Sequence, residues 1–480
     1  MSFADQGWEI KRSRAQDMLR PSLQCKYLQL AQETLEREAL EVRLRDTNER
    51  LEARISMIHT RIHRFPHTLR GIGGVEGNRR YVEPSVVAIG PYHHAGFWDS
   101  MEEVKHAAAY RLLKGQGRTV EEVYKKVLSV AGAARRCYDD ASPLVAGLSD
   151  AEFVDMMFVD GCFLVWYLKP PPGGDPLLTG CAFSYGHNIL KDILRLENQI
   201  PLPVLEALMD SPVDLRTLLP TKATHFFFNR AEEKVRPCNV MRFPMKYCRR
   251  VPADERSSSI SLGDSKPPHL LGLLRSYMIS GMPRQKTSVN ISGPSSLLSR
   301  SAVDLAQIGV KLTASTAHWF ADMKVQRQLL CGDLSLSSLS LGDFAACCLV
   351  NMAALETAES FDASSSEPDA FVVSSYLSLL TMLMDREEDV HELRMRGVLR
   401  STFSNAQTLA FFKELGQYLQ HGYDYRNTKV KISEYIRQRP VRTAVHKFVY
   451  NNHRIIVAVL SIAGALVGIL KALYYSLNKP

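Results

Sequence analysis

The sequence Ile455-Ile-Val-Ala-Val-Leu-Ser-Ile-Ala-Gly-Ala-Leu-Val-Gly-Ile-Leu470 contains no charged residue. Lys471 follows it, and residues 472–477 are again mostly apolar. A helix needs about 20 apolar residues to cross the hydrocarbon core of a membrane, and a lysine at its end can extend its side chain to the headgroups. We therefore predict a single transmembrane helix over residues 455–477. The alternative is a buried helix of a soluble core.

The basic residues of the chain are concentrated next to this segment. Residues 426–480 contain ten Lys/Arg and one acid, Glu434, a local charge of +9 in a total of +8, so the preceding 425 residues sum to −1. Eight of the ten cations precede the span, and the positive-inside bias then predicts a cytosol-facing body. We expect residues 426–454 to form a basic juxtamembrane segment that contacts the lipid bilayer. No basic stripe indicates a nucleic-acid partner.

The N-terminus and the cysteines agree with a cytosolic location. Residues 1–20 are charged throughout and lack the apolar core of a secretory signal, so we expect insertion through the C-terminal span. The nine cysteines include no Cys-x-x-Cys pair. This pattern favours reduced thiols over a disulfide framework or a structural zinc site. No cofactor fingerprint is present.

The rest of the chain reads as mainly α: a helical body with loop-rich inserts, ahead of the single transmembrane helix. We expect residues 1–60 to form an N-terminal amphipathic helical segment. Its long amphipathic helix is predicted over 26–64 and packs either on the body or in a partner coiled coil. The body spans 61–425. Its predicted helical stretches are 101–168, 187–196, 301–330, 343–359 and 371–420, separated by Gly/Pro-rich turns at 66–94 and a mobile insert at about 252–300.

Four short motifs in this body are too distinctive for generic helix. They are Tyr81-Val-Glu-Pro84 with Ile89-Gly90-Pro91-Tyr92-His93-His94; Met156-Met-Phe-Val-Asp160-Gly161-Cys162-Phe163; Asp192-Ile-Leu-Arg-Leu-Glu197-Asn198-Gln199-Ile200-Pro201; and Glu388-Asp389-Val390. In this order, ahead of a C-terminal span, they resemble the plant family catalogued as domain of unknown function 247. The resemblance covers about residues 60–480, and the Leu-Glu-Asn-Gln-Ile-Pro string is its most specific part.

Two positions depart from the family pattern. Leu202-Pro203 stands where aromatic residues usually follow Pro201, and Trp166 stands where an acidic residue is common. The resemblance implies a mostly helical protein with a C-terminal membrane segment and no established enzymatic activity. Certain grass members are implicated as pollen-side determinants of self-incompatibility, which suggests recognition or signalling as the functional class.

An active site built from these motifs would be a Cys/His pair. A membrane-bound hydrolase or transferase would need Cys162 beside His93 or His94. However, Cys162 lies among apolar residues, where a buried thiol is the usual outcome. The two adjacent histidines point in different directions, which disfavours a shared metal. We therefore expect no catalytic, cofactor-binding or metal-binding residue, and retain the Cys/His enzyme as the alternative.

The polar string Glu197-Asn198-Gln199 has two interpretations as well. Its side chains either satisfy backbone groups left open at a helix end, which we favour, or line a polar pocket for a ligand or partner peptide.

Within the span, Gly464 and Gly468 have the small-xxx-small spacing through which two helices can approach closely, although glycine is common in membrane helices in any case. We thus predict a non-enzymatic, tail-anchored membrane protein that binds an unidentified protein partner, with homo-oligomerisation through this helix as an option. Asn290-Ile-Ser292 is a glycosylation sequon that would matter only in the inverted topology.

Overall fold

The computed structural model describes residues 37–51, 62–94, 99–138, 142–170, 176–209, 213–227, 267–280, 300–315, 320–327, 331–360 and 370–477. The chain divides into two compact units, 1–59 and 60–480. In the first unit, residues 37–51 are helical, as predicted. The helix does not continue to residue 64, because residues 62–66 are non-helical. Residues 26–36 and 52–61 of the prediction lie outside the described residues.

The first half of the second unit is helical. Its α-helices are α2 (Gly74–Gly77), α3 (Asp99–Gln116), α4 (Val120–Arg135), α5 (Pro143–Ala146), α6 (Asp150–Leu168), α7 (Pro176–Asp192), α8 (Leu202–Leu208), α9 (Val213–Ala223) and α10 (Leu270–Ile279). At the centre lies α6, which contacts α3, α4 and α8. A Ser149–Glu152 capping box begins α6. Because its sequence is apolar on every side, α6 is buried almost throughout.

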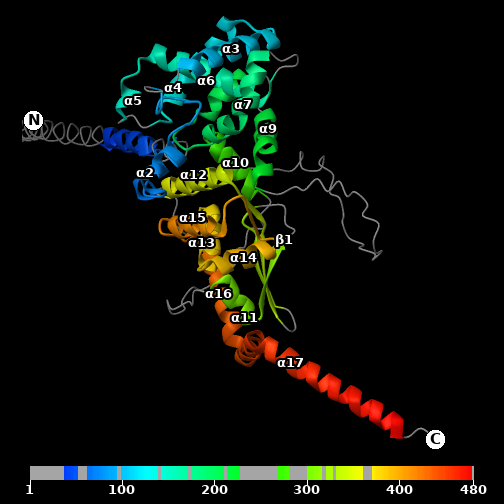
Figure 1. Ribbon diagram of the computed structural model, residues 1–480. Helices are drawn as coiled ribbons and strands as arrows, with labels where there is room; N and C mark the ends of the chain where they lie inside the picture. Colours follow the sequence, from blue (N-terminus) through cyan, green and yellow to red (C-terminus); the bar gives the residue numbers. More distant parts are fainter. Residues whose placement is uncertain are drawn as a thin grey trace, which may run out of the picture. The chain divides into compact units, whose positions relative to one another are not determined.

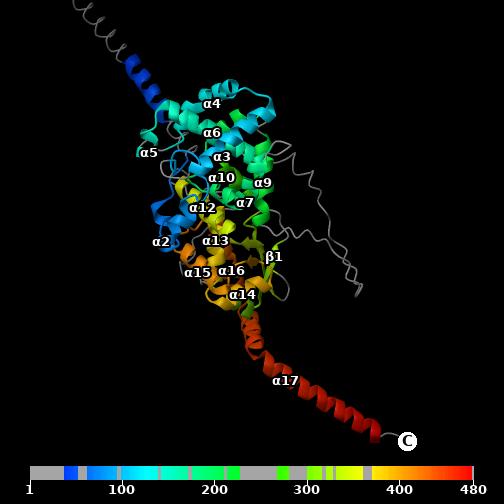
Figure 2. The same ribbon diagram turned by 45° about the horizontal axis from the view of Figure 1, so that its top comes forward.

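The second half carries the strands. Its α-helices are α11 (Ala302–Gln307), α12 (Asp343–Glu359), α13 (Val372–Leu383), α14 (Glu387–Met395), α15 (Asn405–Gly416), α16 (Tyr423–Gln438) and α17 (Pro440–Leu477). Figures 1 and 2 both show α3, α4 and α6 on one side of α12, with α13, α15 and α16 on the other. Nearly every residue of α12 and α13 is buried, so these two helices form the core of this half. The mainly α prediction is confirmed.

The expectation of helix across 301–330 is wrong beyond α11. The strands β1 (Val310–Ser315) and β2 (Met323–Arg327) flank β3 (Gly332–Ser337) in a sheet of order β1-β3-β2, with β1 parallel and β2 antiparallel to β3. In a second sheet, β4 (Leu339–Leu341) runs parallel to β5 (Leu399–Ser401). The first three residues of β1 alternate between buried and exposed. An alternation over only three residues is too short to distinguish a strand from part of a helical pattern.

The structure also differs from two other predictions, the mobile insert at 252–300 and the helix at 187–196. Inside the predicted mobile insert, residues 267–280 are ordered: they contain α10, whose four leucines are buried. Burial of these leucines stabilises the folded state. The Ser/Pro-rich composition of the surrounding residues hid this short apolar run in the sequence. Residues 252–266 and 281–299 lie outside the described residues. The helix expected over 187–196 instead begins at Pro176 and ends at Asp192.

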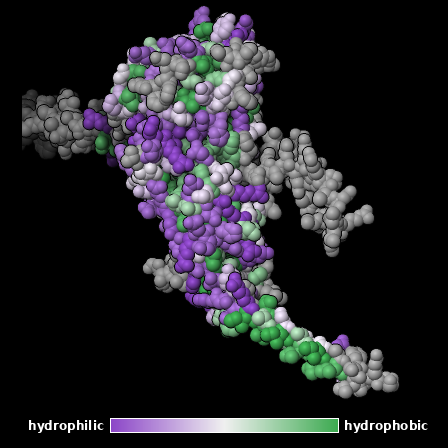
Figure 3. Space-filling view, in the orientation of Figure 1, coloured by the Kyte–Doolittle hydropathy of each residue, from purple (hydrophilic) through white to green (hydrophobic). Residues whose placement is uncertain are grey.

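The C-terminal helix α17 differs from the other helices of the second unit in exposing a long apolar stretch. Its window Arg454–Lys471 has a mean hydropathy of 2.1, and none of it is buried. Figure 3 shows apolar side chains covering the visible side of this helix. Among the described residues it is the one helix long and apolar enough to cross a membrane. Because the window is exposed, it is not a core helix of the described body.

A buried carboxylate joins three of the core helices. Glu356 of α12 is fully buried and accepts hydrogen bonds from the Nε of Arg275 in α10 at 3.0 Å and from the backbone N–H groups of Val373 and Ser374 at 2.9 and 2.8 Å. These bonds replace the water that the carboxylate loses on burial. They also satisfy free N–H groups at the start of α13.

We expect Glu356→Gln to destabilise the fold by about 3–5 kcal/mol, because it leaves the buried Arg275 without a charged partner and turns an amide toward backbone donors. The measurement is thermal unfolding of the full chain in detergent, followed by circular dichroism. Glu103→Gln, at an exposed position of α3, is the control and should change stability by less than about 0.5 kcal/mol. Equal melting temperatures for the two variants would contradict this role.

Candidate functional site

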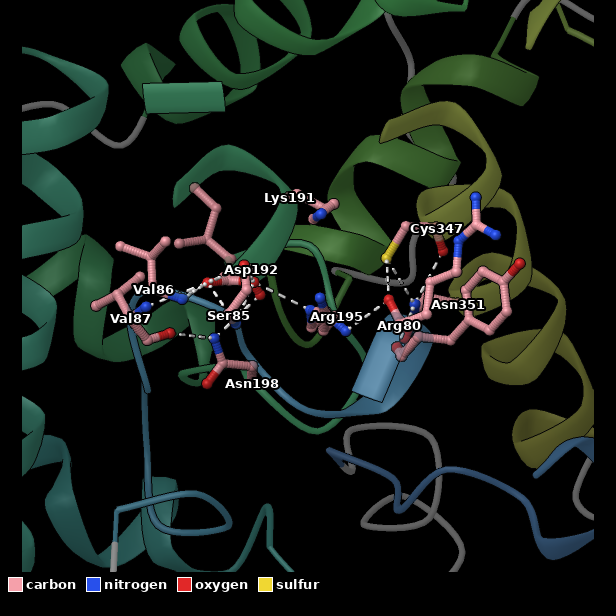
Figure 4. A network of polar contacts seen from close by, with 12 residues as sticks. Arg80, Ser85, Val86, Val87, Lys191, Asp192, Arg195, Asn198, Cys347 and Asn351 are labelled. Carbon is pink, nitrogen blue, oxygen red and sulfur yellow. Dashed lines mark hydrogen bonds and ion pairs between the residues drawn. The ribbon is translucent and has the colours of Figure 1, made fainter. Parts of the chain in front are cut away.

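Three of the four sequence motifs meet in one buried polar network, which begins at Asp192. This residue ends α7, and its carboxylate accepts backbone N–H bonds from Ser85, Val86 and Val87 at 2.9, 2.6 and 3.1 Å. Arg195 donates from Nε to the same carboxylate at 3.1 Å. Both charged side chains are at most 1% exposed. Figure 4 shows the three backbone donors and Arg195 gathered around Asp192.

The network continues from Arg195 to α12. The Nη1 atom of Arg195 donates to the carbonyl oxygen of Arg80 at 2.9 Å. Beside it, the Asn351 side chain of α12 accepts from Leu196 N–H at 2.8 Å and donates to the Tyr81 carbonyl at 2.9 Å. Figure 4 shows Asn351 and Arg195 reaching the same stretch of chain from opposite sides. The segment around 80–87 is thereby fixed between α7 and α12.

Asn198 and Gln199 extend the network along the backbone. Asn198 Oδ1 accepts from Ile89 N–H at 2.6 Å, and its Nδ2 donates to the carbonyls of Val87 and Asp192, each at 3.0 Å. Gln199 Nε2 donates at 2.7 Å to the carbonyls of two residues in the turn that follows α7, while its Oε1 accepts from Leu271 N–H at 3.2 Å. These side chains satisfy backbone groups at the end of α7, which agrees with the interpretation favoured from the sequence.

Asp160 of α6 binds the backbone of the first motif at Gly90. It accepts from Gly90 N–H at 2.9 Å and forms a 2.7 Å ion pair with Lys105 of α3. Burial lowers the pKa of Lys105, but Asp160 and Glu102 together outweigh that effect and raise it, so this buried lysine is charged. Gly90 has φ +71°, and a Cβ there would lie 2.7 Å from the Gln199 carbonyl oxygen, so only glycine fits.

Glu197 is where the network approaches the surface. Its Oε1 accepts from Phe65 N–H at 2.8 Å and Arg70 Nη2 at 2.9 Å, with Arg64 Nε at 3.7 Å. The Nε2 atom of His93 lies 3.7 Å from the other carboxylate oxygen. Burial lowers the pKa of His93, so its ring is neutral at pH 7. Glu197 is buried, whereas Arg64 and Arg70 are 40% and 32% exposed.

The remaining motif residues serve packing. Pro84, Pro91, Tyr92 and Phe163 are buried, and Pro201 precedes the first turn of α8. A Cβ on Gly161 would lie 2.4 Å from a Leu208 methyl, so this glycine permits the close approach of α6 and α8. His94 is exposed.

Cys162 does not have the surroundings of a nucleophile. It is fully buried in α6, and burial raises the pKa of its thiol to about 12, although the charge of Arg118 acts in the opposite direction. In the described part of the chain, no hydrogen bond joins it to a histidine; His93 lies against Glu197 instead. The structure therefore does not bring together the Cys/His pair that the enzymatic alternative requires. Nor does any group of three His, Cys, Asp or Glu among the described residues have a metal-binding arrangement.

The fourth motif lies apart from the network. Asp389 accepts from the N–H groups of Asp385 and Arg386 at 3.1 and 2.9 Å, and from Val303 N–H at 2.9 Å. It thus caps the start of α14 and fixes the start of α11 beside it. Val390 is buried next to it.

The sequence alone did not indicate which cations pair with the carboxylates of the network. Arg195, Lys105 and Arg70 pair with Asp192, Asp160 and Glu197. For Arg195 a signal was present, because it follows the helix-ending Asp192 by three residues. Lys105 and Arg70 come from distant segments, so no local pattern indicates their partners.

The class of the protein is thus a mainly α-helical protein with one exposed apolar helix at its C-terminal end. Residues 62–467 match the family described as plant protein of unknown function, domain of unknown function 247, and the chain belongs to this family. A UPF0481 protein of Arabidopsis thaliana is similar, with 25% identity over 376 residues that cover 75% of each chain. No solved structure matches the chain.

We expect Asp192→Asn to loosen the segment 85–87, because the amide group removes the charge that Arg195 requires and presents N–H groups to backbone donors. The free-energy cost should be about 3 kcal/mol or more. Hydrogen exchange of the Ser85, Val86 and Val87 amides measures the effect directly and should accelerate. Asp150→Asn, whose side chain is 96% exposed, is the control. Unchanged protection in Asp192→Asn would contradict the anchoring role.

Cys162 should resist alkylation in the folded chain. With a pKa of about 12, only about one thiol in ten thousand is ionised at pH 8, and burial further blocks the reagent. Timed labelling with iodoacetamide, read by mass spectrometry, should spare Cys162 until denaturant is added, when all nine cysteines react. Rapid, stoichiometric labelling of Cys162 in the folded protein would instead restore the Cys/His enzyme.

Proposed function

We propose that this chain is a non-enzymatic, single-pass membrane protein whose helical body recognises a protein partner on the cytosolic side. The observation that carries the proposal is α17, where the apolar window Arg454–Lys471 is wholly exposed in the isolated chain. Exposure of so much apolar surface to water is unfavourable, at about 25 cal/mol per Å². A bilayer removes that cost along the whole window.

The distribution of charge supports a cytosolic body. Eight cations in residues 426–454 precede the span, against Lys471 and Lys479 within and after it. Of these eight cations, Arg442, Lys447 and Arg454 belong to α17, the helix that contains the window. This asymmetry favours retention of residues 1–454 on the cytosolic side.

The chemistry of the motifs supports recognition over catalysis. The carboxylates of Asp160 and Asp192 are both occupied by buried cations and backbone N–H groups. A catalytic carboxylate must instead reach a substrate. The network therefore serves as a rigid support for surface residues. Of these, Arg64 and Arg70 at the Glu197 edge are 40% and 32% exposed, and their positive charge suits a carboxylate-bearing partner. Certain grass members of the resembled family are implicated in self-incompatibility, and this association suggests the same class of function.

The test is membrane fractionation with protease protection on sealed vesicles, using the full chain with a fluorescent protein at its N-terminus. We expect the protein to sediment with membranes, resist extraction by salt, and remain accessible to protease. The double variant Leu460→Arg/Val467→Arg adds about 2.5–3.5 kcal/mol per substitution near the helix centre, and should become soluble without unfolding.

Other results would overturn parts of the proposal. A soluble wild-type chain would remove the membrane anchor. A membrane-bound but protease-protected body, with a glycan on Asn290, would invert the topology and make recognition extracellular or lumenal.

A further inference from the structure

Apolar side chains in α17 recur at alternating steps of four and three residues. The positions are Val441, Val445, Phe448, Asn452, Ile455, Val459, Ile462, Leu466, Ile469 and Leu473, and Asn452 is the one polar member. We call this row the α17 seam. Steps of four and three give a repeat of 3.5 residues, which is the repeat of a left-handed coiled coil.

The first three seam residues are informative because they precede the membrane window. Val441, Val445 and Phe448 are 74%, 56% and 63% exposed. Within the window nearly every residue is apolar, so a seam there would arise by composition alone. In the turns before it, residues 440–453, six of the ten positions off the seam are polar or charged. Of the apolar residues there, Ala444 and Val449 each adjoin a seam residue, and Pro440 and Tyr450 lie off the seam.

The opposite side of these turns is held by the body. Helix α17 contacts α11 and α16, and the ring of His446 lies so close to Gly309 that a Cβ on this glycine would be 2.6 Å away. Gly309 has φ +81°, a conformation that glycine adopts freely. At about 100° per residue, His446 lies about 100–160° around the helix from Val441, Val445 and Phe448. The body therefore leaves the seam uncovered.

We propose that a second copy of this chain packs along the α17 seam, as a parallel coiled coil that begins outside the membrane and continues into it. This proposal rests on the proposed function in one respect, namely that α17 crosses a bilayer.

The continuity of the seam selects this occupant. Val441 precedes Arg454 by 13 residues, or about 20 Å of helix at 1.5 Å per residue, which is beyond the headgroup layer if the helix continues straight. Lipid alone would then leave the first seam residues in water. The partner must present an apolar helical face both before and inside the membrane. A second copy has that face, in the same orientation, because both chains insert the same way.

The positions beside the seam fit close, parallel packing. The residues immediately before Val445, Asn452, Val459 and Leu466 are Ala444, Asn451, Ala458 and Ala465. Small or uncharged residues at this flank let two helices approach and avoid like-charge contacts between copies. A polar asparagine within an otherwise apolar seam fixes the register of two strands, since its side chain is best satisfied by the same residue of the partner.

The seam is distinct from the glycine face predicted from the sequence. Gly464 lies about 160° around the helix from both Ile462 and Leu466. A Cβ at Gly464 or Gly468 would meet nothing within 4 Å. Association through the seam and association through the glycines can therefore be separated by mutation.

The test is oxidative cross-linking of the full chain in vesicles at low protein density. Helix α17 contains no cysteine. In Val445→Cys the two introduced thiols face each other across the seam, within disulfide reach, and most chains should migrate as a dimer under non-reducing conditions. Lys447→Cys lies two residues away, about 160° around the helix and off the seam. It should stay monomeric, as should the parent chain with its native cysteines.

Two further variants make the result specific. Adding Phe448→Glu to Val445→Cys should abolish the dimer, because it places two like charges in the apolar seam. Adding Gly464→Leu and Gly468→Leu should leave the dimer unchanged. Circular dichroism spectra equal to the parent's exclude unfolding as the cause of a lost dimer.

Each contrary outcome has a distinct meaning. If the chain floats with vesicles yet Val445→Cys does not cross-link, the seam proposal is wrong and the membrane anchor stands. If the chain does not float, the proposed membrane function fails first. Cross-linking of Val445→Cys to a different protein, equal cross-linking of both cysteine variants, or loss of the dimer only in the glycine variants would each overturn the seam.

Discussion

The carboxylate of Asp192 is the group on which the arrangement of this fold most depends. The chain at 83–90 is irregular, and five of its eight residues are buried. A buried backbone without regular structure must find other partners for its N–H groups. Asp192 supplies three of them, Asn198 a fourth at Ile89 and Asp160 a fifth at Gly90. Arg195 in turn compensates the buried charge of Asp192. One acid at a helix end thus allows a loop to run through the core.

This constraint explains why the motifs are so distinctive. A polar side chain that bonds particular backbone groups, at one place in the fold, tolerates few replacements. The string Leu-Glu-Asn-Gln-Ile-Pro carries three such side chains in succession, and each is directed at a different segment. Sequence specificity of this kind arises from the geometry of the fold and does not require a substrate.

The parts of the structure that follow from short-range pattern were predictable from the sequence. Helices over 101–168 and the apolar C-terminal helix depend on spacing along the chain, and the helix-ending role of Asn198 and Gln199 depends on position alone. The strand β1 was missed because its six residues contain too few alternations, and its parallel pairing with β3 is not a local property. Lys105 could not be assigned to Asp160, since the two partners lie 55 positions apart in the sequence and no local pattern links them.

The contact between His446 and Gly309 has a mechanical consequence. A flexible linker before a membrane helix lets an attached domain sample a volume set by the linker length. Here a single residue, Arg439, separates α16 from α17, and α17 packs against α11 as it leaves the body. If α17 is the anchor, this rigid connection holds the body at a defined height and tilt relative to the membrane. Partners on the same membrane would then meet it by diffusion in two dimensions, with the same face presented at every encounter.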